Sequence, residues 1–87
     1  MLLRNHGTLT VGQTCAEAFL RMYFLERACT MQVRTRALGG EDHPTEMSVI
    51  EKNMALSEGE SLRNAAKELV WPALLRKLDR TDPSFRN

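Results

Sequence analysis

Few side chains in this sequence could bind a metal ion. It contains two histidines, His6 and His43, and two cysteines, Cys15 and Cys29, together with 11 carboxylates. A catalytic zinc ion usually takes three protein ligands and a structural zinc ion four, and the known motifs hold pairs of these ligands close together in sequence. No such pair occurs here. We therefore expect the chain by itself to lack a complete metal site.

His6 is the better placed of the two histidines. It lies between Asn5 and Gly7, at the expected end of a short strand, and loops at strand ends often hold functional residues. His43 precedes Pro44 in a linker, which favours a solvated side chain or a helix cap. On residue types alone a single histidine is more often structural than metal-binding, so both interpretations of His6 stay open.

The remaining motifs offer no nucleophile or phosphate site. Cys15 and Cys29 are expected on one helix, where their separation is about 21 Å along the axis, and a disulfide requires Cα atoms within about 7 Å. Buried free thiols are the simpler interpretation. The sequence has no Gly-x-Ser-x-Gly elbow, and Gly39-Gly40 follows a helix where an anion-binding loop would precede one.

The elements expected to position His6 are a short β segment and a long helix. Leu2-Leu3 and the alternating run 8–11 predict two strand pieces around the turn. Thr14 and Glu17 form a capping-box pattern, which predicts a helix over 14–38 that ends at Gly39-Gly40. Its apolar stripe is wide enough to predict packing on two neighbours, with the following residues on the buried side: Ala18, Phe19, Met22, Tyr23, Phe24, Leu25, Met31 and Val33.

Two further helical patterns follow a linker at 41–45. Pro44 is expected at the start of a helix that continues to about Ser57. Apolar spacing then predicts a helix over 61–78, with a kink or break near Trp71 because Pro72 has no N–H to donate. Residues 79–87 show no periodicity and are expected to be an exposed or partner-bound terminus. The predicted fold class is mostly α with a short N-terminal β element.

Composition limits the possible partners. Apolar residues make up 43% and charged residues 26% of the chain, and the net charge is +1. Ordinary soluble domains have such values, and they predict neither nucleic-acid nor membrane binding. The basic residues Arg76, Lys77 and Arg80 read as a solvated helix face. Without a secretory signal pattern, we expect a cytoplasmic protein.

The run Leu-Leu-Arg-Asn-His-Gly-Thr-Leu-Thr-Val-Gly at 2–12 and the helix pattern after it resemble the last conserved block of the class II aldolase/adducin family. The resemblance covers residues 1 to about 40, and residues 41–87 read as a helical extension. It implies that the chain is a C-terminal fragment of an α/β/α domain, with a zinc ligand at His6 and no other ligand in this sequence. The family's His-x-His pair, acid/base residue and phosphate-binding loops are missing here.

The resemblance implies a zinc-dependent parent, a lyase or epimerase acting on small sugar phosphates, of which this fragment is expected to be inactive. It also implies a homo-oligomer. Adducin itself shows that the fold serves without catalysis. The alternative hypothesis is therefore a non-catalytic helical module for oligomerisation or adducin-like interaction.

Overall fold

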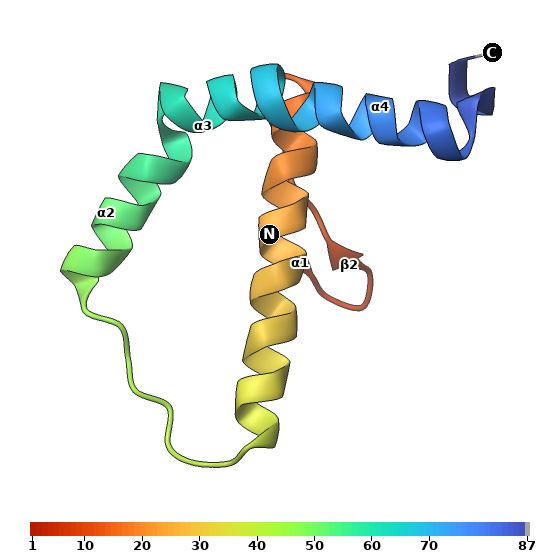
Figure 1. Ribbon diagram of the computed structural model, residues 1–87. Coiled ribbons are helices and arrows are strands. Elements are labelled where there is room, and N and C mark those ends of the chain that lie inside the picture. Colours follow the sequence, from red (N-terminus) through yellow and green to blue (C-terminus); the bar gives the residue numbers. More distant parts are fainter. Residues whose placement is uncertain (87) are drawn as a thin grey trace.

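The computed structural model describes residues 1–86, which form a mostly helical chain with one small antiparallel sheet (Figure 1). The predicted secondary-structure class is thus confirmed. In chain order the elements are β1 (Leu2–Leu3), β2 (Gly7–Thr8), α1 (Cys15–Ala37), α2 (Met47–Glu58), α3 (Glu60–Ala65), a π-helical turn η1 (Ala66–Val70), α4 (Trp71–Thr81) and a 3₁₀ turn η2 (Pro83–Arg86).

The β element is a hairpin. Leu2 pairs with Thr8 and Leu3 with Gly7. Strand β2 ends at Thr8, earlier than the alternating pattern over 8–11 predicted. The Leu9 N–H still donates to the Met1 carbonyl at 2.9 Å, so the backbone pairing extends one residue past the two strands.

Helix α1 begins and ends where the sequence predicts. The Thr14 hydroxyl accepts a hydrogen bond from the Glu17 N–H at 3.2 Å, which caps the N-terminus. The Glu17 carboxylate returns to the N–H of Gln13, one residue before the N-terminal cap. At the other end Gly39 and Gly40 both have positive φ, a conformation that glycine adopts without a steric penalty.

Helix α2 begins later than predicted. Glu46 occupies the N-cap and makes no side-chain capping bond, so Pro44 lies in the preceding loop and not at the helix start. The predicted separation of this helix, ending at about Ser57, from the next one over 61–78 is confirmed, because α2 ends at Glu58 and α3 begins at Glu60, immediately after Gly59.

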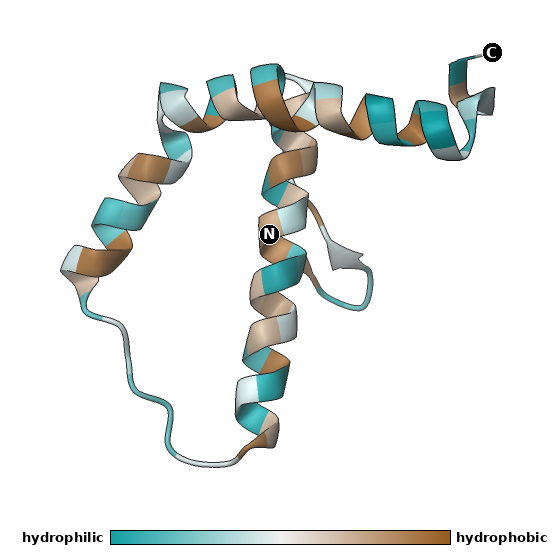
Figure 2. Ribbon diagram, in the orientation of Figure 1, coloured by the Kyte–Doolittle hydropathy of each residue, from teal (hydrophilic) through white to brown (hydrophobic). Residues whose placement is uncertain are grey.

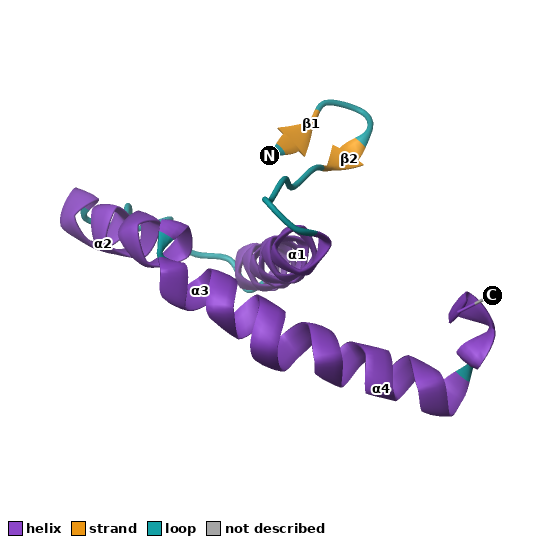
Figure 3. Cartoon of the chain, turned by 90° about the horizontal axis from the view of Figure 1, so that it is seen from above, coloured by secondary structure: helices purple, strands orange, loops and turns teal. Residues whose placement is uncertain are grey.

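Elements α3, η1 and α4 follow one another as a nearly continuous rod (Figure 3). The predicted break near Trp71 takes the form of the π turn, in which the Trp71 N–H bonds to the Ala66 carbonyl five residues earlier. This turn directly precedes Pro72, which cannot donate to the carbonyl of Glu68. Residues 79–86 are exposed, which agrees with one of the two expectations for this terminus, and they are also regular in structure, because α4 continues to Thr81 and η2 follows; Asn87 lies outside the described residues.

The rod crosses the N-terminal part of α1 and forms a small core there. Ala16 and Leu20 of α1 pack against Ala66 of η1, which is 1% exposed. Alanine at the crossing lets the two backbones approach closely. Phe19 and Trp71 extend the contact edge to face, with ring centroids 6.0 Å apart.

Most of the predicted buried side of α1 is exposed. Helix α1 does contact two neighbours, the rod and the hairpin. Tyr23, Phe24, Met31 and Val33 are nevertheless all at least half exposed, so the predicted burial of these side chains was wrong. The accessible surface is 7653 Å², whereas a compact monomer of this mass exposes about 5,200 Å². The radius of gyration is 16.2 Å, against about 12 Å for a compact domain of this length. The fold is therefore open.

Candidate metal-binding turn

The turn between β1 and β2 presents His6. The His6 N–H donates to the Leu3 carbonyl at 3.2 Å, which closes a four-residue turn. Asn5 has φ of 63°, the left-handed conformation that a type II turn requires at this position and that asparagine tolerates. Gly7 follows with φ of 116°. The residues on either side of His6 are thus those that its tight turn needs.

The His6 ring is held by the backbone of its own turn. Its Nδ1 lies 2.9 Å from the carbonyl oxygen of Arg4. A carbonyl oxygen only accepts hydrogen bonds, so Nδ1 carries the proton. In the neutral ring Nε2 then has a lone pair that is not used in this bond. Metal-binding histidines are commonly oriented in this way, by donation from the second ring nitrogen to a backbone carbonyl.

Two threonines attach the hairpin to α1. The Thr8 hydroxyl lies 2.7 Å from Oε1 of Glu26 and 3.3 Å from Sδ of Met22, and the Thr10 hydroxyl donates to the Ala18 carbonyl at 2.9 Å. This role of the threonines was not among the features predicted from the sequence. The alternation of polar and apolar residues over 8–11 could have indicated it, because both threonines occupy the same face of an extended segment.

Below the hairpin, Glu17 fixes the start of α1. This carboxylate is 3% exposed and accepts from the Gln13 N–H at 2.8 Å and from Arg21 Nη2 at 2.7 Å. The backbone hydrogen bond, assisted by the positive charge of Arg21, holds the pKa of Glu17 below its ordinary value even though burial opposes the shift. Glu17 is therefore a structural carboxylate that stabilises the connection between hairpin and helix.

The lowered pKa of Glu17 predicts a stability that depends on pH. The folded chain binds fewer protons at this group than the unfolded chain does, so the stabilisation is complete above the ordinary value of 4.5 and is lost as pH falls toward the lowered pKa. Thermal unfolding followed by circular dichroism between about pH 3 and pH 7 measures this. Glu17→Gln should flatten the acid limb of the curve; an unchanged acid limb would contradict the assignment.

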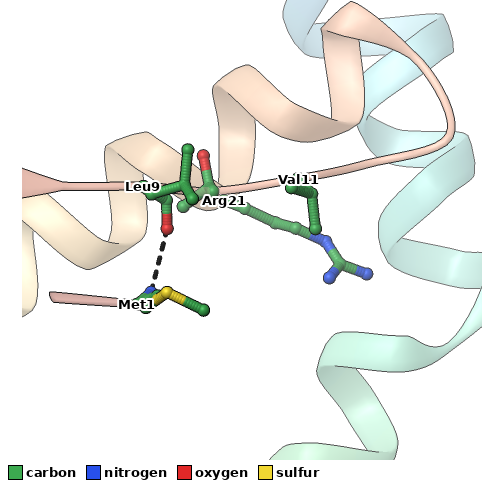
Figure 4. A pocket seen from close by; sticks show the side chains of 5 residues that line it. Met1, Leu9, Val11 and Arg21 are labelled. Carbon is green, nitrogen blue, oxygen red and sulfur yellow. Dashed lines mark hydrogen bonds between the residues drawn. The ribbon is translucent and has the colours of Figure 1, made fainter. Parts of the chain in front are cut away.

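A shallow pocket lies beside the hairpin (Figure 4). It has a volume of about 190 Å³ and is lined by Met1, Leu9, Thr10, Val11 and Arg21. The amino group of Met1, one of the lining residues, donates to the Leu9 carbonyl at 2.9 Å. The lining is mainly apolar and does not include His6. It supplies no cluster of metal donors.

The donors singled out in the sequence do not converge. Among residues 1–86 no group of three or more His, Cys, Asp or Glu side chains could hold a metal ion. His43 is exposed in the loop before α2. Cys15 and Cys29 are free thiols, and Cys15 is exposed although burial was predicted. The His6 turn can therefore supply one oriented nitrogen ligand to a zinc ion. The described residues do not provide the other ligands of a complete site.

The hairpin and most of α1 lie in the part of the sequence that matches a known protein family. Residues 1–33, which hold the His6 turn and most of α1, match the model of the Class II Aldolase and Adducin N-terminal domain. This chain belongs to the class II aldolase/adducin family. The resemblance found in residues 2–12 is confirmed.

Individual relatives extend the similarity beyond the family model. Proteins named "Putative aldolase class 2 protein" from Caulobacter vibrioides and Pseudomonas aeruginosa are 40% and 39% identical over 98% and 99% of this chain, covering 33% and 34% of their own lengths. Alpha-adducin of Rattus norvegicus is 35% identical over 91% of the chain and 12% of its own length. The chain thus spans about a third of the two bacterial relatives. No solved structure matches it.

One further property of the described residues concerns membranes. Among residues 1–86, no helix is both long enough and apolar enough to cross a bilayer.

Proposed function

We propose that this chain is the C-terminal piece of an α/β/α class II aldolase-like domain and supplies one zinc ligand, Nε2 of His6. The conserved block is residues 1–40, and residues 41–87 are its helical extension. The observation that carries the proposal is the hydrogen bond from Nδ1 to the Arg4 carbonyl. That bond holds the ring in the tautomer that a metal ligand needs before any metal arrives.

In this chemistry the role of the chain is to hold one metal ligand, Nε2 of His6, in the correct orientation. A bound zinc ion acts as a Lewis acid that polarises substrate oxygens. The turn contributes a histidine held by its own backbone, and the threonine bonds to α1 keep the turn in place. Further ligands and the acid/base group would come from residues outside this sequence, so the chain alone is proposed to be inactive.

For the complete protein we propose cleavage or epimerisation of small sugar phosphates. Membership of the class II aldolase family supports this reaction class. The net charge of +1 gives no independent support for an anionic substrate. Within this chain, His6 is therefore the residue on which the proposed reaction rests.

Zinc titration of the purified chain tests the proposal, with nitrogen NMR of the imidazole rings as a second measurement. We expect weak binding without a one-to-one endpoint, because a single histidine cannot hold the ion tightly. In the zinc-free chain the neutral His6 ring should show the Nδ1–H form. His43 is the matched control: it is exposed in a loop, so its ring should exchange between tautomers.

Two results would count against it. Tight stoichiometric binding by the isolated chain would contradict the incomplete site. An Nε2–H form of His6 would contradict its preparation as a ligand. His6→Ala and His43→Ala assign the two ring signals and separate their contributions to zinc binding.

A second candidate function is assembly. The chain exposes large apolar side chains on every major helix, and a soluble monomer seldom leaves so many of them uncovered. We propose that the protein forms a homo-oligomer in which these surfaces are covered, consistent with a non-catalytic, adducin-like role for this segment.

A further inference from the structure

Three residues of α1 at four-residue intervals, Ala18, Met22 and Glu26, face the hairpin. Residues spaced in this way lie on one side of a helix. Thr8 contacts the side chains of the second and third of them, and Thr10 donates to the carbonyl of the first. We call this row of three residues the hairpin face of α1.

The hairpin face lies opposite the surface of α1 that packs on the rod. Ala16 and Leu20 form that packed surface. Each residue of an α-helix is turned by about 100° from the one before it, so Ala18 points about 200° away from Ala16. Viewed along α1, the hairpin and the rod lie on opposite sides of the helix (Figure 3). Figure 2 shows hydrophilic residues between the hydrophobic ones along α1. A polar residue of the hairpin face therefore lies away from the core.

The Thr8 hydroxyl has one proton to donate, and Glu26 is the stronger of its two acceptors. The oxygens of Thr8 and Glu26 are 2.7 Å apart, a distance typical of a hydrogen bond to an ionised carboxylate. The thioether sulfur of Met22, at 3.3 Å, is a weak acceptor. Glu26 is exposed and forms no salt bridge within residues 1–86. Charge pairing along the helix therefore does not account for this carboxylate, whereas the bond to the hairpin does.

The places of these hydrogen bonds along α1 decide how freely the hairpin can pivot. The bond from Thr10 reaches Ala18 in the first turn of α1, close to the junction between hairpin and helix. Glu26 lies eight residues further along, about 12 Å on the helix axis. Its bond holds β2 at a point two residues from His6. Without this bond the threonine contact near the junction would remain, and the His6 turn would swing about that point.

We propose that Glu26 is a positioning residue for His6: by accepting the hydrogen bond from Thr8, its carboxylate fixes where Nε2 of His6 lies relative to α1. This inference rests on the zinc ligand proposed above and adds the residue that sets its place. The Arg4 carbonyl orients the ring within the turn, and Glu26 orients the turn on the helix. A metal site assembled from several segments needs both, because its ligands must meet at fixed distances from the ion.

Pseudocontact shifts from bound cobalt(II) measure the position of His6 relative to α1. Co²⁺ binds imidazole, and it shifts the NMR signals of nearby nuclei by amounts that depend on their position relative to the ion. All chains carry His43→Ala, which leaves His6 as the one imidazole of the sequence. The shifts of the α1 amides are divided by those within the His6 turn. Weak and incomplete binding then does not affect the comparison.

Removing either partner of the Thr8–Glu26 bond should reduce the relative shifts on α1 by about half or more, because a swinging turn averages the position of the ion over many orientations. Glu26→Ala and Thr8→Val should act alike, and the double variant should add nothing further, since each removes the same bond. Glu26→Gln and Thr8→Ser each keep a hydrogen-bonding group and should retain most of the shifts. The urea midpoint should change little, because both residues lie outside the core at the rod crossing.

Glu51→Ala and Thr35→Val are the matched controls. Glu51 is exposed on α2, and the Thr35 hydroxyl donates to the Met31 carbonyl of its own helix, so neither change should alter the shifts. Shifts that are absent while His6 is present, or that persist in His6→Ala, overturn the zinc-ligand proposal together with this inference. Shifts that require His6 but are unaffected by Glu26→Ala or by Thr8→Val overturn the positioning role alone.

Discussion

Replacing Leu20 with alanine should separate the α3–η1–α4 rod from α1 and unfold most of the chain. Leu20 is 6% exposed and is the largest buried apolar side chain at the crossing. Removing a buried leucine side chain typically costs about 2 to 5 kcal/mol. Small domains of this length are stable by about 4 to 13 kcal/mol. With so small a core, the substitution removes a large share of the total.

Urea denaturation followed by Trp71 fluorescence and by circular dichroism measures this loss. Trp71 packs on Phe19 at the crossing, so its emission reports the contact directly. Leu38→Ala is the matched control, since Leu38 is 86% exposed and should change stability by less than about 0.5 kcal/mol. Equal effects of the two substitutions would show that the crossing does not hold the fold together.

Local chemistry explains which elements could be predicted from the sequence. The bounds of α1 follow from a Thr14 cap and a Gly39-Gly40 end, and the irregularity at Trp71 follows from Pro72. Each of these signals acts within a few residues of its effect. They therefore operate in the same way whatever packs around the helix.

Burial depended on partners and could not be predicted in this way. The apolar stripe of α1 indicates a face that can be buried, but Phe24 and Val33 are 53% and 70% exposed. This failure concerns contacts with elements that are distant in sequence.

The candidate site likewise has one feature that could be predicted from the sequence and one that could not. The turn that carries His6 could be predicted because Asn5 and Gly7 are the residue types that tolerate its backbone conformation. The orientation of the imidazole could not, since it depends on where the Arg4 carbonyl points once the hairpin has closed. The proposed role of His6 as a zinc ligand comes from the resemblance to the family, and the backbone hydrogen bond gives that proposal a physical reason.

Replacing Gly12 with alanine should disrupt the junction between the hairpin and α1. A Cβ atom at this position would lie 2.7 Å from the backbone nitrogen of Ala18 and about 3 Å from the side chain of Glu17. Backbone atoms of a helix cannot move aside cheaply, and overpacking of this kind costs about 1 to 3 kcal/mol or more. The expected result is loss of the Gln13 hydrogen bond to Glu17, followed by fraying of the first turn of α1.

Hydrogen exchange at the Gln13 amide, measured beside urea denaturation, separates this local effect from global unfolding. The amide should lose its protection in Gly12→Ala. Gly59→Ala is the matched control, because a Cβ there approaches only to 3.3 Å of two carbonyl oxygens and its backbone conformation suits any residue. Full protection of Gln13 in Gly12→Ala would show that the junction accommodates a Cβ atom at position 12 with the bond to Glu17 intact, and would contradict the prediction.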